Sequence, residues 1–232
     1  YEVNYAGVWN ENHETYEVAL SSFCPDAEIH YAINDSVITA SSSLYKSPIL
    51  LSKDAVIYAA VYKEGKSMGR VTHKEFAINK ATGCDYKCGP KTEWEHESFG
   101  LTDGYCGYAQ DMRRWVSFYQ DSVQIVVELK GTQRIKQLAF ASLWRPWNMI
   151  WPAKAMSVSV SADGKNFFGV GNKVLSYDFT LTESTRFPAS LSFPEVEATF
   201  VRLDLLSGGL CPKGYFNEGE QSRLAIDEIE IN

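Results

Sequence analysis

Three tryptophans, an arginine and an asparagine gather in one short stretch, WRPWNMIWPAK at residues 144–154. Aromatic faces stack on the C–H faces of pyranose rings, and arginine and asparagine side chains hydrogen-bond sugar hydroxyls in a small concave site. A second stretch, CPKGYFNEGEQSR at 211–223, adds further aromatic and amide side chains. The residues in the two stretches that could contact a sugar are Trp144, Arg145, Trp147, Asn148, Tyr215 and Asn217.

The same aromatic residues have a second interpretation. Trp151 is followed by Pro152 where a strand is expected to begin, which is typical of a core position, and Trp147 could cover a seam between two domains. Clustered aromatic side chains serve protein interfaces as well as sugar sites. Sugar recognition and packing against another domain are therefore both open at this point.

Two neighbouring carboxylates, Asp227 and Glu228, are a candidate acid–base pair. On an extended strand adjacent side chains point to opposite faces, so these two cannot both reach one glycosidic bond. No histidine lies in a recognisable Ser-His-Asp pattern, and the four histidines are His13, His30, His73 and His96. We therefore expect no catalytic machinery in this chain.

The five cysteines are an odd number, so at least one is unpaired. Cys84, Cys88, His96 and Cys106 could in principle supply four zinc ligands, but the C-x3-C spacing is loose and His96 has no regular position. A disulfide within 84–106, or reduced thiols, fits the spacing better. The count does not decide the redox compartment.

The composition describes a folded, acidic chain. Of its 232 residues 45% are hydrophobic and 13% aromatic, which is enough for a packed core. The net charge of −7 argues against nucleic-acid binding, because phosphate recognition needs clustered Lys and Arg. No apolar run approaches the roughly 18 residues that a membrane span needs. The chain begins at Tyr1 without a signal-like stretch, so we expect a piece of a longer protein or a processed product.

Strand patterns dominate the first third of the chain. Ile29, Tyr31 and Ile33 alternate with less apolar neighbours, as in a half-buried strand. Further apolar stretches at 49–51 and 55–62 follow, with a last strand around Phe76–Ile78. This pattern predicts a small antiparallel β-sandwich over residues 1–80.

Strands resume after a stretch that indicates a linker. Residues 81–97 contain Gly, Pro and charges without a sustained period. Beyond residue 98, apolar residues alternate at 123–129, 156–160 and 201–205. No stretch of ten or more residues shows a helical period, so the βαβ units of nucleotide-binding folds are not expected.

The apolar phase changes near the C-terminus. Leu224 and Ile226 lie on one phase, whereas Ile229 and Ile231 lie on the other. Either a bulge intervenes, or Glu228 points to the same side as Leu224 and Ile226. An inward carboxylate is costly unless it is paired or binds a cation.

The first part of the chain resembles a known domain family. Residues from about 17 to 80, with AEIHYAIND and SSSLYKSPILLSKDAVIYAAVYKEGK, are similar to the C-terminal domain of chitobiase and β-hexosaminidase. That domain is a small immunoglobulin-like sandwich found beside glycoside hydrolase catalytic domains. The family's Asp-Gly turn and Pro-Thr pair read Asn34-Asp35 and Ile38-Thr39 here, whereas Leu44-Tyr45 keeps the pattern.

Residues from about 98 to 232 resemble a discoidin-type (coagulation factor type C) domain, a galactose-binding-like β-jelly roll. The resemblance rests on LTDG at 101–104, the strand and hairpin at 157–167, FVRLDLL at 200–206 and the terminal LAIDEIEIN. Together the two resemblances predict an all-β chain: a small immunoglobulin-like sandwich at 1–80, a linker at 81–97 and a discoidin-type β-jelly roll at 98–232.

This tandem is similar to the C-terminal tails of bacterial β-N-acetylhexosaminidases and α-L-fucosidases. The resemblance implies a non-catalytic accessory region of an extracellular, periplasmic or cell-surface glycoside hydrolase. The jelly roll would be a carbohydrate-binding module for N-acetylhexosamine- or galactose-type sugars, with both candidate loops at its ligand-binding end. The alternative is a structural module that docks on the parent catalytic domain without binding free glycan.

The resemblance also implies a structural calcium ion. In discoidin-like sugar-binding modules such an ion ties the loop after the first strand to the last strand, and the matching positions here are Asp103 and Glu228. Backbone carbonyls would complete the six to eight oxygens that calcium takes. The alternative places Asp103 in a turn and has Glu228 hydrogen-bonded or paired with an arginine. The family's Thr-x-Trp after the Asp-Gly is replaced here by Arg113-Arg114-Trp115.

Overall fold

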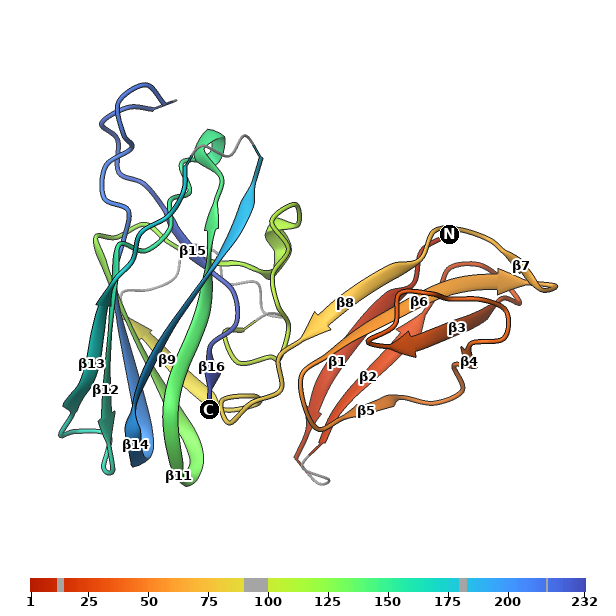
Figure 1. Ribbon diagram of the computed structural model, residues 1–232, viewed down its shortest axis with the longest axis horizontal. Coiled ribbons are helices and arrows are strands. Elements are labelled where there is room, and N and C mark those ends of the chain that lie inside the picture. The colour runs from red at the N-terminus through yellow and green to blue at the C-terminus, as the bar shows by residue number, and fades with distance from the viewer. Residues whose placement is uncertain (12–14, 90–99, 180–182, 216) are drawn as a thin grey trace. The chain divides into compact units, whose positions relative to one another are not determined.

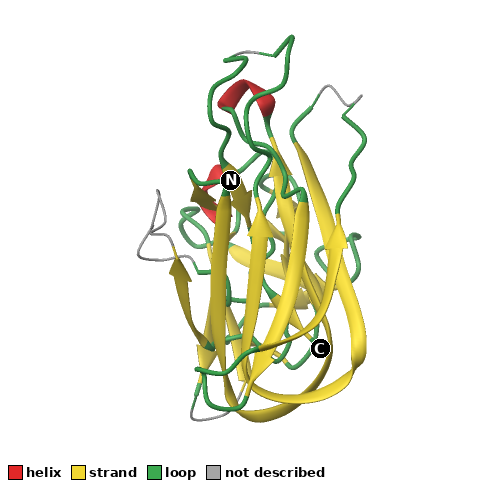
Figure 2. Cartoon of the chain, turned by 90° about the vertical axis from the view of Figure 1, so that its left-hand side faces the viewer, coloured by secondary structure: helices red, strands yellow, loops and turns green. Residues whose placement is uncertain are grey.

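The chain forms two units built almost entirely from strands (Figure 1). The computed structural model describes residues 1–11, 15–89, 100–179, 183–215 and 217–232. The first unit comprises Tyr1–Ile78 and Asp103–Cys106, and the second comprises Asn79–Thr102 and Gly107–Asn232. Helix is limited, over the described residues, to the 3-10 turns η1 (Met112–Arg114) and η2 (Pro146–Asn148), as Figure 2 shows. The predicted all-β fold class is confirmed.

Two antiparallel sheets make up the first unit. One consists of β1 (Asn4–Asn10), β2 (Thr15–Ser21) and β5 (Ile49–Leu51). The other consists of β3 (Glu28–Ile33), β4 (Ser43–Leu44), β6 (Ala55–Lys63), β7 (Lys66–Ser67) and β8 (Thr72–Phe76). Inward side chains of both sheets, among them Tyr16, Val18, Ile57 and Phe76, share one core. This is the sandwich that the strand pattern predicts.

The burial phase of β3 differs from the prediction. Ile33 is 43% exposed, whereas His30 is only 6% exposed. The His30 ring lies 5.0 Å from the Tyr62 ring, and its Nδ1 lies 2.9 Å from the Ser42 carbonyl oxygen, so Nδ1–H can donate to it. Residues beyond β3 therefore cover the second face of the strand, which its own alternation could not indicate.

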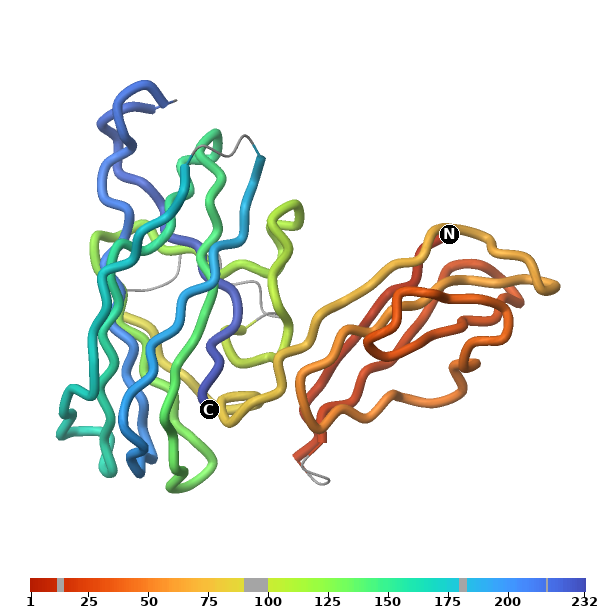
Figure 3. Tube along the Cα trace, viewed as in Figure 1, coloured from red at the N-terminus to blue at the C-terminus, as the bar shows by residue number. Residues whose placement is uncertain are grey.

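The second unit is organised around two long strands, β11 (Ser122–Trp144) and β14 (Thr185–Leu206), which pair antiparallel along most of their length (Figure 3). The pairing shifts register between Glu128 and Gln133 and again between Ile135 and Gln137. Such irregularities let a strand bend and serve two layers. The neighbouring strands are β9 (Asp85–Gly89), β10 (Val116–Phe118), β12 (Ala155–Ser161), β13 (Phe168–Val174), β15 (Leu224–Ile226) and β16 (Glu230–Ile231).

Each layer of the second unit uses a different half of these long strands. The first half of β11 pairs with β9 and with the end of β14, which in turn pairs with β12. The second half of β11 pairs with the beginning of β14 and meets β15 and β16. The predicted inward positions of 123–129, 156–160 and 201–205 are all buried in one core between the layers. The jelly roll is confirmed at this level.

The predicted linker and domain boundary are corrected in two places. Residues 85–89 form strand β9, which pairs with β11 as part of the second unit. Asp103–Cys106 group with the first unit, where Tyr105 packs against Phe76. A five-residue edge strand has too little periodicity of its own to be recognised, because its pairing with β11 decides it. Residues 90–97 of the predicted linker lie outside the described residues.

The change of phase near the C-terminus is an interruption between two short strands. Strand β15 ends at Ile226 and β16 begins at Glu230. Asp227, Glu228 and Ile229 lie between them, and all three are buried, as are Ile226 and Ile231. The chain thus turns both of its sides to the protein interior here, and Glu228 points inward with no exposed surface, as the second alternative predicts.

No helix among the described residues is long and apolar enough to cross a membrane.

Candidate functional site

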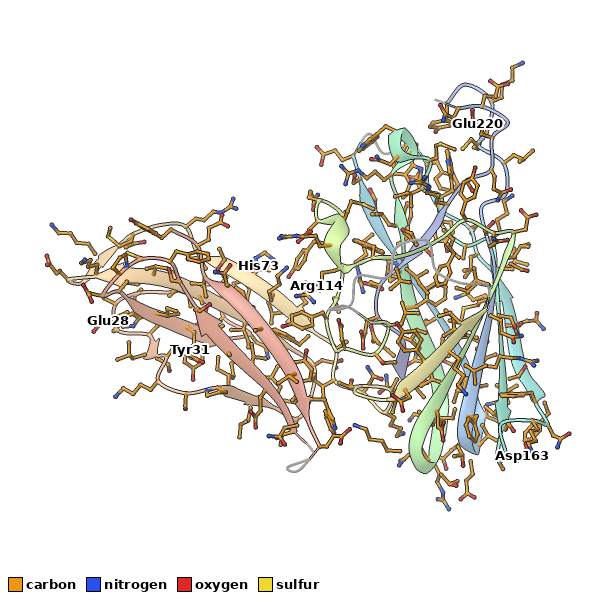
Figure 4. The ribbon with its side chains drawn as sticks, turned by 180° about the vertical axis from the view of Figure 1, so that it is seen from behind. Glu28, Tyr31, His73, Arg114, Asp163 and Glu220 are labelled. Atoms are coloured by element: carbon orange, nitrogen blue, oxygen red, sulfur yellow. The ribbon has the colours of Figure 1, made fainter. Side chains whose placement is uncertain are left out.

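The six candidate sugar-binding residues occupy five different environments at one end of the second unit. We call this the loop end and define it by residues 145–154, 175–179 and 207–223. Glu220 marks it in Figure 4, where Asp163, at the β12–β13 hairpin, marks the opposite end. The strands position these loops, because β11 ends, β12 begins and β14 leaves the sheet here.

Trp144 belongs to the interior. It is the last residue of β11 and only 2% exposed. Its ring centroid lies 5.9 Å from that of Phe179 and 6.4 Å from those of Trp151 and Phe187. The prediction that Trp144 contacts a sugar is therefore corrected, because its inward phase in the strand leaves no face for a ligand.

Trp147 points outward from a tight turn. The backbone N–H groups of Arg145 and Ile150 donate to each other's carbonyl oxygens, at 2.9 and 3.2 Å. Between them η2 carries Trp147, and Met149 closes the turn in the left-handed region at φ 61°. Trp147 is 47% exposed, and the Arg145 guanidinium carbon lies 5.8 Å from its ring centroid. The turn therefore presents an indole and a cation together.

A small cavity adjoins this turn. Its volume is about 260 Å³, and Arg113, Trp115, Ser117, Asn148, Ile150 and Arg223 line it together with Met112. Arg113 Nε and one of its terminal amines donate to the two carboxylate oxygens of Asp111, both at 2.9 Å. These bonds raise the pKa of Arg113 and fix the guanidinium. We call this the arginine cavity, and it combines an amide, a hydroxyl and cationic donors in one concave site.

Tyr215 lines a different and larger cavity. Its volume is about 500 Å³, and its walls include Trp151, Tyr177, Phe179 and Tyr215. We call this the aromatic cavity. Trp151 is 4% exposed, which confirms the prediction that it is a core residue, and it forms the inner wall. Phe179 and Tyr177 come from a segment after β13 that the sequence pattern did not mark.

Asn217 ties two loops together. Its backbone is left-handed at φ 62°, and its Nδ2 donates to Met149 Sδ at 2.9 Å and to Glu220 Oε2 at 3.0 Å. The amide thus connects the loop of residues 211–223 to the turn that carries Trp147. Its role in this structure is to position that turn.

Three hydrogen-bond donors hold Asp227, and its neighbour Glu228 is fully buried. Asp227 accepts hydrogen bonds from the backbone N–H groups of Ala141 and Gly107, at 2.9 and 3.1 Å, and from Arg186 Nε at 2.7 Å. Burial raises the pKa of Asp227, and Arg186 and the two amides oppose that shift. Arg186 in turn lines a groove of about 620 Å³ along the beginning of β14. The sequence marked Asp227 as a candidate, but no neighbouring residue in the sequence indicated that Arg186 is its partner.

The two predicted calcium ligands fall in different units. Asp103 belongs to the first, where its Oδ1 accepts from the backbone N–H of Tyr105 at 3.0 Å. Glu228 belongs to the second, and the backbone N–H of Ile229 donates to the Leu101 carbonyl oxygen at 2.7 Å. The terminal strand thus lies beside the segment that leads to the Asp-Gly turn. Glu228 is a buried carboxylate, and carboxylate oxygens are ligands that a hard cation takes.

The cysteines form no site over the described residues. All five carry free thiols, which agrees with the reduced-thiol alternative. No group of three or more His, Cys, Asp or Glu side chains that could hold a metal occurs within the described part of the chain. His96, the fourth candidate zinc ligand, lies outside it.

Comparisons with known proteins match parts of the chain. A family described as Fn3 associated matches residues 18–76, about a quarter of the chain and most of the first unit. No curated protein matches this chain. The chitobiase C-terminal domain, which this region of the sequence resembles, is thus not the family that matches.

Solved structures similar to the chain include carbohydrate-binding modules. Chitosan-binding module 1 of a chitosanase/glucanase from Paenibacillus sp. IK-5 is 15% identical, covers 66% of this chain and 98% of its own, and has a TM-score of 0.44. A module of a family 31 glycoside hydrolase from Clostridium perfringens is 14% identical over 64% and 92%, with a TM-score of 0.43. A Clostridium perfringens module in complex with GalNAc-β-1,3-galactose is 19% identical over 63% and 94%, with a TM-score of 0.37. Similarity this low does not identify a ligand, so any proposal of a ligand must be argued from the residues of this chain.

Proposed function

We propose that the second unit is a carbohydrate-binding module that uses the turn at residues 145–150 and the arginine cavity. The observation that carries this proposal is the half-exposed Trp147 ring, held beside Arg145 and next to a cavity lined by Asn148. A sugar ring stacks its C–H face on an exposed indole, while amide, hydroxyl and guanidinium groups bond its hydroxyls.

The rigidity of this turn favours binding. The paired backbone bonds of Arg145 and Ile150 and the Asn217 contact with Met149 hold Trp147 outward before any ligand arrives. A preorganised aromatic side chain loses little conformational entropy on binding. Aromatic side chains on rigid turns therefore suit weak ligands such as sugars.

We further propose that the chain is the non-catalytic accessory region of a glycoside hydrolase, outside the cytoplasm or at the cell surface. The resemblance to β-N-acetylhexosaminidase tails supports that parent, and an α-L-fucosidase is the alternative. The occupation of Asp227 by Arg186 and two backbone amides supports a non-catalytic role. A bound module would raise the effective concentration of the parent enzyme at its glycan.

A structural calcium ion beside Glu228 is part of the proposal. The complete burial of Glu228 supports it, and so does the bond from the backbone N–H of the adjacent Ile229 to the carbonyl oxygen of Leu101, two residues before Asp103. Calcium that binds the folded chain should raise its melting temperature over that in EDTA. Replacement of Glu228 by Gln should abolish this calcium-dependent shift, and magnesium serves as the ion control. A melting temperature that is the same with and without calcium would remove calcium from the proposal.

A docking function has its own supporting observation. Leu206 and Leu210 are 48% and 61% exposed at and beyond the end of β14, at the loop end. Exposed apolar side chains near each other are typical of a protein interface. In this alternative the loop end packs on the parent catalytic domain and binds no free glycan.

The test is isothermal titration of the chain with two glycans. Chitotriose and GalNAc-β-1,3-galactose are the probes, because they are the ligands of the second Paenibacillus chitosan-binding module and of a Clostridium perfringens module. Trp147→Ala should weaken binding about tenfold or more, since it removes the stacking face. Phe168→Ala is the matched control, because Phe168 is 56% exposed at the hairpin end of the same unit.

Either of two outcomes would contradict the proposed site. Binding whose affinity and stoichiometry are both unchanged in Trp147→Ala would contradict a site at Trp147. No binding to either probe, together with association of the chain with the separately produced parent catalytic domain, would favour docking.

A further inference from the structure

The aromatic cavity has the properties of a second ligand site. Its volume of about 500 Å³ lies within the roughly 300–1,000 Å³ typical of small-molecule sites. Phe179 is partly exposed at 37%, and Tyr215 is half-buried, so aromatic faces are accessible from outside. We propose that this cavity binds a second sugar ring, of the kind whose substituents are all equatorial. The inference rests on the proposed function, because both assign a glycan as ligand.

The shape of the walls selects the ring. Trp151 meets Tyr215 at 88° and Phe179 at 64°, with ring centroids 4.9 and 5.3 Å apart. The aromatic faces thus form corners in place of one flat platform. A pyranose with equatorial substituents exposes apolar C–H groups on both of its faces, so it can contact two walls at once. An axial hydroxyl would point a polar group at one of the rings.

The walls are fixed before a ligand binds. The Trp151 backbone N–H donates to the Arg223 carbonyl oxygen at 2.9 Å. Behind it, Gly208 approaches so closely that a Cβ at that position would lie 2.5 Å from Trp151 Cβ. Phe187 contacts both Phe179 and Tyr177 from within, at 6.2 and 4.8 Å between centroids. The cavity is therefore preorganised, which favours affinity.

The polar groups of the lining limit the charge of the ligand. Lys154 is the only charged side chain that lines the cavity among the described residues. Ser176 contributes a hydroxyl, whereas the hydroxyl oxygen of Tyr177 is buried and is not available to a ligand. An ammonium and a neutral hydroxyl suit a neutral or acidic sugar and repel an amino sugar. N-acetylglucosamine thus fits the cavity, and glucosamine does not.

The two cavities lie on opposite sides of one segment. Ile150 and Trp151 run beside Arg223, since Ile150 bridges to Arg223 and the Trp151 N–H donates to the Arg223 carbonyl oxygen. Successive side chains on an extended segment point to opposite sides. Ile150 packs with Trp115 and lines the arginine cavity, whereas Trp151 packs with Trp144 and lines the aromatic cavity. The sites are therefore separate, and one chain can hold two glycan segments at once.

The experiment is a titration of the whole chain with the β-1,4-linked trimer of N-acetylglucosamine. Wild type should bind two trimers, and Tyr215→Ala should leave one. Tyr215→Phe keeps the ring and should bind two again, which separates loss of the wall from loss of the fold. Trp147→Ala should remove the other site, and the trimer of glucosamine should bind the aromatic cavity at least tenfold more weakly than the acetylated trimer.

The possible outcomes distinguish this inference from the proposed function. Two-trimer binding that is unchanged in Tyr215→Ala would overturn the inference. Binding of one trimer, lost in Trp147→Ala and kept in Tyr215→Ala, would overturn it and leave the proposed function standing. Binding lost in Tyr215→Ala but unaffected by Trp147→Ala would support the inference and contradict the proposed site at Trp147. A melting curve of each variant that matches wild type is required for these readings.

Discussion

Replacement of Arg186 by Met should destabilise the second unit strongly, because it leaves a buried carboxylate without its cation. The Asp227 side chain has no exposed surface, and Arg186 Nε donates to it at 2.7 Å. The two remaining donors are the backbone N–H groups of Ala141 and Gly107. Both donors belong to the backbone and stay in place in the variant, so the carboxylate keeps two hydrogen bonds. It loses its ion pair with Arg186.

The size of the effect follows from this burial. Removing one partner of a buried ion pair costs about 3–5 kcal/mol. The Arg186 side chain is 27% exposed, so solvent screens part of its charge, and two amides still stabilise Asp227. We therefore expect about 3 kcal/mol, at the low end of that range. Arg186→Met/Asp227→Asn, which removes the charge and keeps the shape, should recover most of this loss.

The pH dependence gives an independent check. Burial already raises the pKa of Asp227, and loss of Arg186 should raise it further. In the unfolded chain an aspartate carboxyl has a pKa of about 3.9. A carboxyl whose pKa is higher in the folded chain destabilises that chain at pH values where it must be ionised. This destabilisation is lost as the pH falls toward about 4, because the carboxyl of the folded chain is then protonated. The difference between Arg186→Met and wild type should therefore shrink on acidification.

Urea unfolding followed by tryptophan fluorescence measures both effects. Among the described residues the second unit contains Trp115, Trp144, Trp147 and Trp151, and the first contains Trp9, so the signal reports mainly on the second unit. The free energy of unfolding is compared at pH 7 and pH 5 and at constant ionic strength. A loss below about 1 kcal/mol at pH 7, or a double variant no more stable than Arg186→Met, would refute this account of the pair.

Three further predictions concern single positions. Trp144→Ala should lower the free energy of unfolding by about 3–5 kcal/mol because it leaves a cavity in the core, whereas Trp147→Ala should change it by no more than about 0.5 kcal/mol. Urea unfolding compares the two variants, and equal losses would contradict the assignment of Trp144 to the interior and Trp147 to the surface. Gly208→Ala should cost about 1–3 kcal/mol because its Cβ would press on Trp151, and a stability equal to wild type would mean that the backbone yields. Hydrogen bonds from the backbone N–H groups of Asn166 and Lys165 lower the pKa of Asp163, so its contribution to stability is complete above about pH 4 and is lost as the pH falls below that. In Asp163→Asn the melting temperature should therefore fall less on acidification than it does in wild type. An equal fall in both proteins would exclude this turn as its source.

Much of the fold could be predicted from local patterns. The inward phases of 123–129, 156–160 and 201–205 are buried as their alternation indicates, because a strand's side chains alternate whatever its partners are. The phase change near Ile229 marked Glu228 as inward, and Trp151 before Pro152 marked a core position. Strand β9 escaped prediction because its five residues become a strand only by pairing with β11.

The candidate site could be predicted only in part. The stretch 144–154 was recognised by its residue types, but its tryptophans take opposite roles, because β11 ends at Trp144 and a 3-10 turn then reverses the chain. A left-handed Met149 closes that turn, and a methionine gives no sequence signal for such a conformation.

The sequence by itself determined that the chain is all-β, which residues face the core in its long strands, and where aromatic and amide groups concentrate. Alternation and residue type are local properties, so they need no knowledge of the fold. Only the tertiary structure decided that Trp147 is exposed, that Arg186 neutralises Asp227, and that Trp151 and Tyr215 share a cavity with Phe179. Those relations join residues tens of positions apart, and they exist because the pairing of distant strands brings their ends together.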